Sequence, residues 1–104
     1  MSRGPDAATL LERALCRAAA DAGVTMTVDS VDSARWASVT FTGARHEVRI
    51  SAPHSPVLDG WLADLHEQKF RMPGHLVADL AVAAISRECG NVRAGIEVLT
   101  VESR

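Results

Sequence analysis

Two histidine–glutamate pairs are the first groups in this sequence that could do chemistry, because a His-Glu pair on a helix begins a zinc-protease motif. That motif needs a second histidine one helical turn after the first, on the same face. The pairs, each with the residue at this second position, are His46-Glu47 with Ile50 and His66-Glu67 with Phe70. Neither completes the motif, and the other histidines, His54 and His75, add no spacing that would gather the donors zinc requires. The sequence therefore predicts no bound metal.

His75, Asp79 and Arg71 form the most suggestive group for a small-ligand site, in which they would act as acid, base and anion clamp. His75 and Asp79 share one face of either a helix or a strand. On a helix, residues at this spacing lie ~6 Å apart and can hydrogen-bond. Along a strand, at ~3.3 Å per residue, they lie ~13 Å apart. The secondary structure of this segment therefore decides whether the pair exists.

Signals for a reactive thiol or a nucleotide cofactor are weak. Cys16 and Cys89 are too far apart for a CxxC pair, which predicts free thiols in a reducing compartment. Cys16 falls on a polar helix face between Arg13 and Arg17, a setting that can lower a thiol pKa, but no base is placed near it. The seven glycines are scattered and form no phosphate-binding loop, so we expect no cofactor.

Two helices should position these groups. Apolar residues recur at helical spacing over residues 6–22, where Asp6 opens the segment and Gly23 supplies a left-handed cap at its end. Ser55 caps a second helix, residues 56–66, which begins with a proline.

Alternating apolar residues between the helices predict three short strands joined by tight turns. The expected strands are residues 24–29, 36–42 and 45–50, with turns at Asp32-Ser33 and Gly43, and with Val39 and Phe41 on the buried face. In this phase Trp36 falls on the polar outer face, where a large aromatic ring marks either a contact surface or cross-strand packing.

Residues 76–86 fit both a helix and a strand, because periodicity alone does not separate the two. Residues 92–101, rich in Val, Ile and Thr, predict a strand that needs a neighbour, so we favour a hairpin turning through residues 89–91. If Ser86 pairs with Val92, the opposite pairs are Asp79 with Leu99, Val77 with Val101, and Ala83 with Gly95. The outer face of this hairpin would then be apolar and flat.

These elements predict a single α+β domain over residues 1–104, since this length suits one domain. About five strands would form one antiparallel sheet, covered on one face by the two helices in a two-layer sandwich.

Composition excludes several classes of partner. Eleven Lys and Arg against thirteen Asp and Glu give a net charge of -2, which provides no basic field for nucleic acid or an anionic membrane. The longest apolar run, Leu80–Ile85, is far shorter than the ~18 residues that span a bilayer. Glu12 and Arg13 interrupt the first apolar stretch, which therefore lacks the pattern of a secretory signal and predicts a cytoplasmic protein.

Four segments stand out together: Trp36 to Ser38, FTGARH at 41–46, GHLVADL at 74–80 and LTVE at 99–102. With these segments the chain resembles a small family of uncharacterised bacterial proteins of about this length. The resemblance implies an α+β domain with the element order argued above, and it carries no activity and no site residues to transfer.

The sequence favours a non-enzymatic interaction module that self-associates, most simply as a homodimer, or binds a protein partner through one sheet face. The residues expected in that contact are Trp36, Val77, Ala81, Ala83, Ile85, Leu99 and Val101. The alternative is a small enzyme or ligand-binding domain with a pocket near His75, Asp79 and Arg71.

Overall fold

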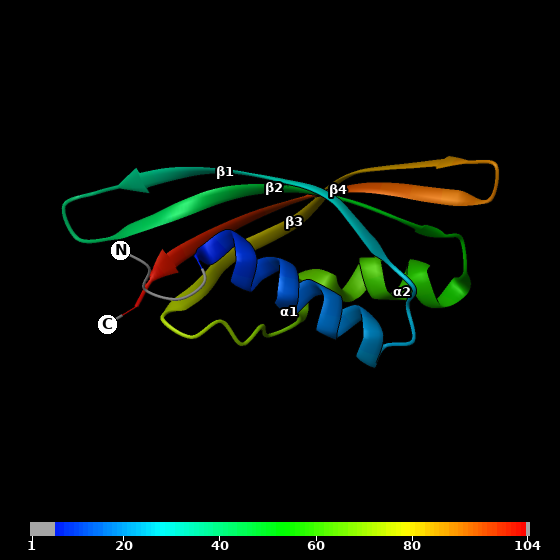
Figure 1. Cartoon of the computed structure of the whole chain (residues 1–104), viewed down its shortest axis with the longest axis horizontal. Coiled ribbons are helices and arrows are strands. Elements are labelled where there is room, and N and C mark those ends of the chain that lie inside the picture. The colour runs from blue at the N-terminus through cyan, green and yellow to red at the C-terminus, as the bar shows by residue number, and fades with distance from the viewer. Residues whose placement is uncertain (1–5, 104) are drawn as a thin grey trace.

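The computed structural model describes residues 6–103, which form two helices, a short 3-10 turn and four strands (Figure 1). In chain order these are α1 (Ala7–Asp21), β1 (Thr27–Ala37), β2 (Thr42–Pro53), α2 (Pro56–Asp64), the 3-10 turn η1 (Leu65–Glu67), β3 (His75–Glu88) and β4 (Asn91–Glu102). The α+β class is confirmed.

Both helices begin at the caps that the sequence predicts. The Asp6 carboxylate accepts a hydrogen bond from the Thr9 N–H at 2.9 Å, and the Ser55 hydroxyl accepts one from the Leu58 N–H at 3.0 Å. Each bond satisfies a donor that has no partner within its helix. Gly23 has a φ of +78°, the left-handed conformation expected just after α1.

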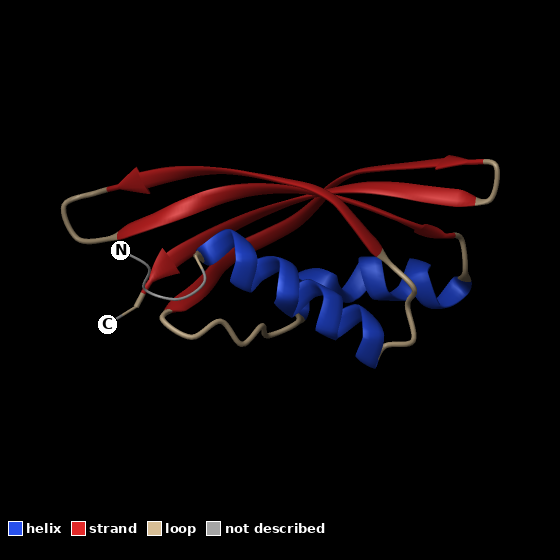
Figure 2. Cartoon of the chain, in the orientation of Figure 1, coloured by secondary structure: helices blue, strands red, loops and turns tan. Residues whose placement is uncertain are grey.

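The four strands form one antiparallel sheet in the order β1-β2-β4-β3, and both helices lie against one face of it (Figure 2). Apolar side chains from that face and from the helices make a single core. Its fully buried members include Leu11, Leu15, Val48, Leu58, Leu65 and Ile96. No helix within residues 6–103 has the length and apolar character needed to cross a membrane.

The sheet has four strands rather than about five, because β1 runs straight through the turn expected at Asp32-Ser33. The turn at Gly43 is also wrong, since the chain reverses at residues 38–41 instead. There the Ser38 N–H donates to the Phe41 carbonyl at 2.7 Å, and the Phe41 N–H donates to the Ser38 hydroxyl at 3.0 Å. Val39 and Phe41 therefore project from a hairpin tip, with Phe41 55% exposed, and are not buried.

Residues 75–88 are a strand, as predicted, but two bulges change which side chains share a face. The register shifts between Val77 and Asp79 and again between Val82 and Ala84. Each bulge inserts one residue without a partner and so reverses the alternation beyond it. Strict alternation therefore cannot assign the side chains of β3 to the two faces along its whole length.

The bulges also change the predicted pairing of the C-terminal hairpin. Asp79 does lie opposite Leu99, as expected. The remaining pairs are shifted by one residue: Ser86 with Arg93, Val77 with Thr100, and Ala84 in place of Ala83 with Gly95.

Candidate functional site

The face of the sheet turned away from the helices is called here the open face, and no helix covers it in the described part of the chain (Figure 2). Cross-strand register arranges its side chains in rows. From one end to the other the rows are Thr27-Ser51-Arg93-Ser86, Ser30-Arg49-Gly95-Ala84, Asp32-Glu47-Glu97-Ala81, Ala34-Arg45-Leu99-Asp79 and Trp36-Gly43-Val101-Leu76. The middle of the face is charged and one end is apolar.

We call Trp36, Leu76, Leu99 and Val101 the apolar end. Leu76 is 61% exposed, and the other three are half-buried. Gly43 lies between Trp36 and Val101, and a Cβ on this glycine would collide with the Thr100 carbonyl oxygen and come within 2.9 Å of the indole ring. The glycine therefore leaves room for the indole ring of Trp36 to pack against the sheet, and the ring stays half-buried.

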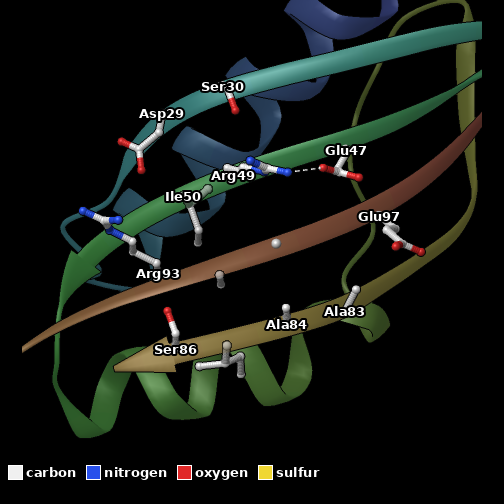
Figure 3. A pocket seen from close by; sticks show the side chains of 13 residues that line it. Asp29, Ser30, Glu47, Arg49, Ile50, Ala83, Ala84, Ser86, Arg93 and Glu97 are labelled. Carbon is white, nitrogen blue, oxygen red and sulfur yellow. Dashed lines mark hydrogen bonds and ion pairs between the residues drawn. The ribbon is translucent and has the colours of Figure 1, made fainter. Parts of the chain in front are cut away.

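A shallow hollow of about 650 Å³ occupies the part of the open face shown in Figure 3. Small residues line it, including Ala83 and Ala84 and, from β4, Gly95, while charged groups stand around it. Within this rim Arg49 pairs with Glu47 at 2.8 Å, and the Ser51 hydroxyl donates to Asp29 at 3.1 Å. The acids and bases on this face thus partly satisfy one another.

The structure places the predicted contact residues on both faces. Trp36, Ala81, Leu99 and Val101 lie on the open face, and Ala83, at a bulge, lines its hollow. Val77 was expected there, but it pairs with the buried residue Thr100 and shares the helix-covered face. Ile85 pairs with the buried residue Ala94, which places it on the helix-covered face, but it is 51% exposed and also borders the hollow. The bulges on either side of Leu80 explain this correction, and Leu76 takes the place expected of Val77.

The expected ligand residues are not brought together. His75 lines a cavity beside the N terminus of α1, Asp79 lines a depression on the open face, and Arg71 lines a groove along the outside of α1. The strand conformation of β3 also removes the His75–Asp79 pairing that a helix would have allowed.

A different histidine, on the helix-covered face of the sheet, takes part in a chain of hydrogen bonds. His46, only 3% exposed, contacts the Ser33 hydroxyl through Nδ1 at 2.6 Å and the Thr100 hydroxyl through Nε2 at 3.0 Å. Thr100, which is fully buried, donates its own proton to the Ala44 carbonyl at 3.4 Å. The tautomer consistent with that bond has the His46 Nε2–H donating to the Thr100 oxygen and Nδ1 accepting from Ser33.

Burial lowers the pKa of His46, and the nearby His75 lowers it further, whereas Asp6 raises it. The first effect is the largest, because removing an imidazolium from water disfavours the charged form. His46 is therefore neutral at neutral pH. Ser33, by contrast, is exposed, so this chain runs from solvent into the core.

Ser33, His46 and Thr100 border a cavity of about 540 Å³ at the end of the sheet. The first residues of α1, Ala7 and Ala8, line its other side. Arg35 and Glu102 also line it and approach each other at 3.8 Å. This volume suits a small molecule.

Sequence reasoning misses Ser33 because it places this residue in a turn. A usable signal does exist in the residues that form the real turn, since a hairpin closed at residues 38–41 pairs residue 37 with 42 and therefore 33 with 46. Locating that turn correctly would have put a serine hydroxyl beside an imidazole.

The remaining candidates show no built site. No group of three or more His, Cys, Asp or Glu side chains in the described part of the chain is placed to hold a metal ion. Cys16 and Cys89 are free and exposed. Burial raises the pKa of Cys16, with a contribution from Glu12, so its arginine neighbours do not activate this thiol.

No protein-family model, curated protein or solved structure matches this chain. The resemblance described from the sequence therefore adds no activity or site to the geometry above.

Proposed function

We propose that this protein is an interaction module that forms a homodimer through the open face, with the apolar end as the anchor at one side of the contact. The observation that carries the proposal is a four-stranded sheet with both helices on one face and an uncovered face that holds Trp36, Leu76, Leu99 and Val101. Exposed apolar groups rimmed by charged ones are typical of a contact surface.

The size of the open face supports a second copy as the occupant. The eleven residues of β1 at ~3.3 Å each, across four strands ~4.8 Å apart, give a face of roughly 700 Å². A stable interface buries about 800 Å² on each partner. A two-fold axis uses the same patch twice, so no second surface is required.

The shape of the face also suits another sheet. Sheets pack face to face at ~10 Å when small side chains let the layers approach. Ala81, Ala84 and Gly95 are such small residues in the middle of the open face. Trp36 then supplies the large anchoring side chain at the rim.

The test is sedimentation equilibrium of the wild type and matched variants across a range of micromolar concentrations. Leu76→Glu and Leu99→Arg place a charge in the apolar end and should give monomers. Val57→Glu is the control, because Val57 is 51% exposed but lies on α2, away from the open face. A wild type that stays monomeric at high micromolar concentration, or a control that dissociates as readily as Leu76→Glu, would contradict the proposal.

A further inference from the structure

The chain of Ser33, His46 and Thr100 has the connections of a nucleophile, its base and a group that orients the base. The three residues come from β1, β2 and β4, so the sheet itself fixes their spacing. The distances are 2.6 Å from Ser33 Oγ to His46 Nδ1 and 3.0 Å from His46 Nε2 to Thr100 Oγ1. Both lie within the range of short, well-formed hydrogen bonds.

The hydrogen bond that Thr100 donates at the buried end of the chain indicates which ring nitrogen of His46 carries the proton. The Thr100 hydroxyl donates to the Ala44 carbonyl, so its oxygen accepts from His46, and the imidazole presents its lone pair to Ser33. A neutral imidazole with a free nitrogen beside a hydroxyl is the form that can accept that proton.

The cavity at Ser33 offers a place for the group that would be attacked. Ala7 and Ala8 are the first residues of α1, where main-chain N–H groups have no carbonyl partner in the helix and the dipole is positive. Donors of this kind favour the negative oxygen that develops when a carbonyl is attacked. Ser33 is exposed while His46 and Thr100 are buried, so only the nucleophile meets solvent.

We propose that Ser33 is a nucleophile that takes acyl groups from activated carboxylic esters, with His46 as its base and Thr100 as a positioning residue. Ser33 Oγ forms a bond to the acyl carbon while its proton moves to His46 Nδ1. The ester C–O bond then breaks, and the leaving alcohol takes that proton.

Hydrolysis completes the cycle at the same atoms. Water attacks the acyl carbon and gives a proton to Nδ1. The bond to Ser33 Oγ breaks, the serine oxygen recovers the proton, and a carboxylic acid departs. This site lies on the helix-covered side, so it does not depend on the proposed dimer.

The test uses an alkyl fluorophosphonate, which reacts with activated serines. Ser33 Oγ would bond to phosphorus, fluoride would leave, and the hydroxyl proton would pass to His46. Intact-mass spectrometry should show one adduct per chain, and peptide mapping should place it on Ser33. Ser33→Ala should abolish labelling, whereas Ser30→Ala, on the same strand but the open face, should label like the wild type.

Two further variants separate a chemical role from a structural one. His46→Gln should slow labelling by ~100-fold or more. Thr100→Val keeps the shape of the buried side chain but removes the acceptor for Nε2–H, and it should slow labelling by ~10-fold. It should also move the pH at which labelling is half-maximal, while the other charged groups around the cavity stay unchanged: Asp6, Arg35, His75 and Glu102.

A wild type that labels no faster than Ser33→Ala would overturn the proposal, as would an adduct on another serine. If Thr100→Val folds, as judged by circular dichroism, and keeps both the wild-type rate and the wild-type pH profile, then the chain of hydrogen bonds is only structural and the proposal is wrong.

Discussion

Trp36 lies directly opposite Gly43 across the β1–β2 pair, and its ring stands where a side chain on the glycine would be. Gly43→Ala should therefore destabilise the protein by ~1–3 kcal/mol, because the added methyl group collides with the Thr100 carbonyl and crowds the indole. Gly60→Ala is the matched control. No atom lies within 4 Å of a Cβ at that helical position, so it should stabilise by ~0.5–1 kcal/mol. Urea denaturation of both variants checks the two opposite signs.

Core packing of α1 and α2 against the sheet gives a second prediction. Leu15 is fully buried and Leu62 is 4% exposed, so Leu15→Ala or Leu62→Ala should cost ~2–5 kcal/mol. Val57→Ala, at an exposed position on α2, should change the free energy of unfolding by less than ~0.5 kcal/mol. A loss below that value at both leucines would contradict the observed packing.

The lowered pKa of His46 predicts loss of stability in mild acid. The unfolded chain takes up a proton on this histidine near pH ~6.5, before the folded protein does, so the free energy of unfolding falls as the pH drops below that value. The loss levels off once the pH is below the folded-state pKa. Denaturation midpoints should be compared between neutral pH and pH ~5 for the wild type and His46→Asn, which lacks this proton. If the denaturation midpoints of the two proteins fall equally between these pH values, the prediction from His46 is wrong.

The two faces of β3 should respond differently to an introduced charge. Val77→Glu should lower the free energy of unfolding, because Val77 pairs with Thr100 on the helix-covered face. Leu76→Glu should leave that free energy nearly unchanged, since Leu76 is 61% exposed on the other face. Thermal melts at a concentration that keeps both proteins monomeric make this comparison. The reverse order would mean that the faces of β3 are assigned wrongly.

Salt should strengthen the proposed dimer rather than weaken it. The open face carries more acidic than basic groups: Asp29, Asp32, Glu47, Asp79 and Glu97 against Arg45, Arg49 and Arg93. Two copies facing each other therefore repel, and added salt screens that repulsion. The dissociation constant should fall between low and physiological ionic strength, as measured by sedimentation equilibrium. Dissociation by salt would point instead to ion pairs as the main contacts.

The parts of this fold that depend on local chemistry could be predicted from the sequence. Asp6 and Ser55 cap the helices through hydrogen bonds to residues only three positions away. The Cys89-Gly90 turn likewise uses positive φ angles within two neighbouring residues. Such signals are complete within a few residues of sequence.

The rest depends on contacts between distant segments. Ala78 and Ala83 look like ordinary members of an alternating strand, and nothing in their side chains marks the two bulges in β3. Ser33 and His46 meet only because the chain reverses at residues 38–41, where Val39 and Phe41 had suggested a buried strand instead. One wrongly placed turn is therefore the reason that sequence analysis misses Ser33 as a candidate nucleophile.

The bulges have a consequence for growth of the sheet. All three register shifts fall in β1 and β3, the two outermost strands, whereas β2 and β4 pair with each other without interruption. A bulge breaks the even row of free N–H and C=O groups that a strand from another molecule would need. The bulges therefore disfavour strand addition at both borders of the sheet, most of all along β3, where two of them fall in one strand.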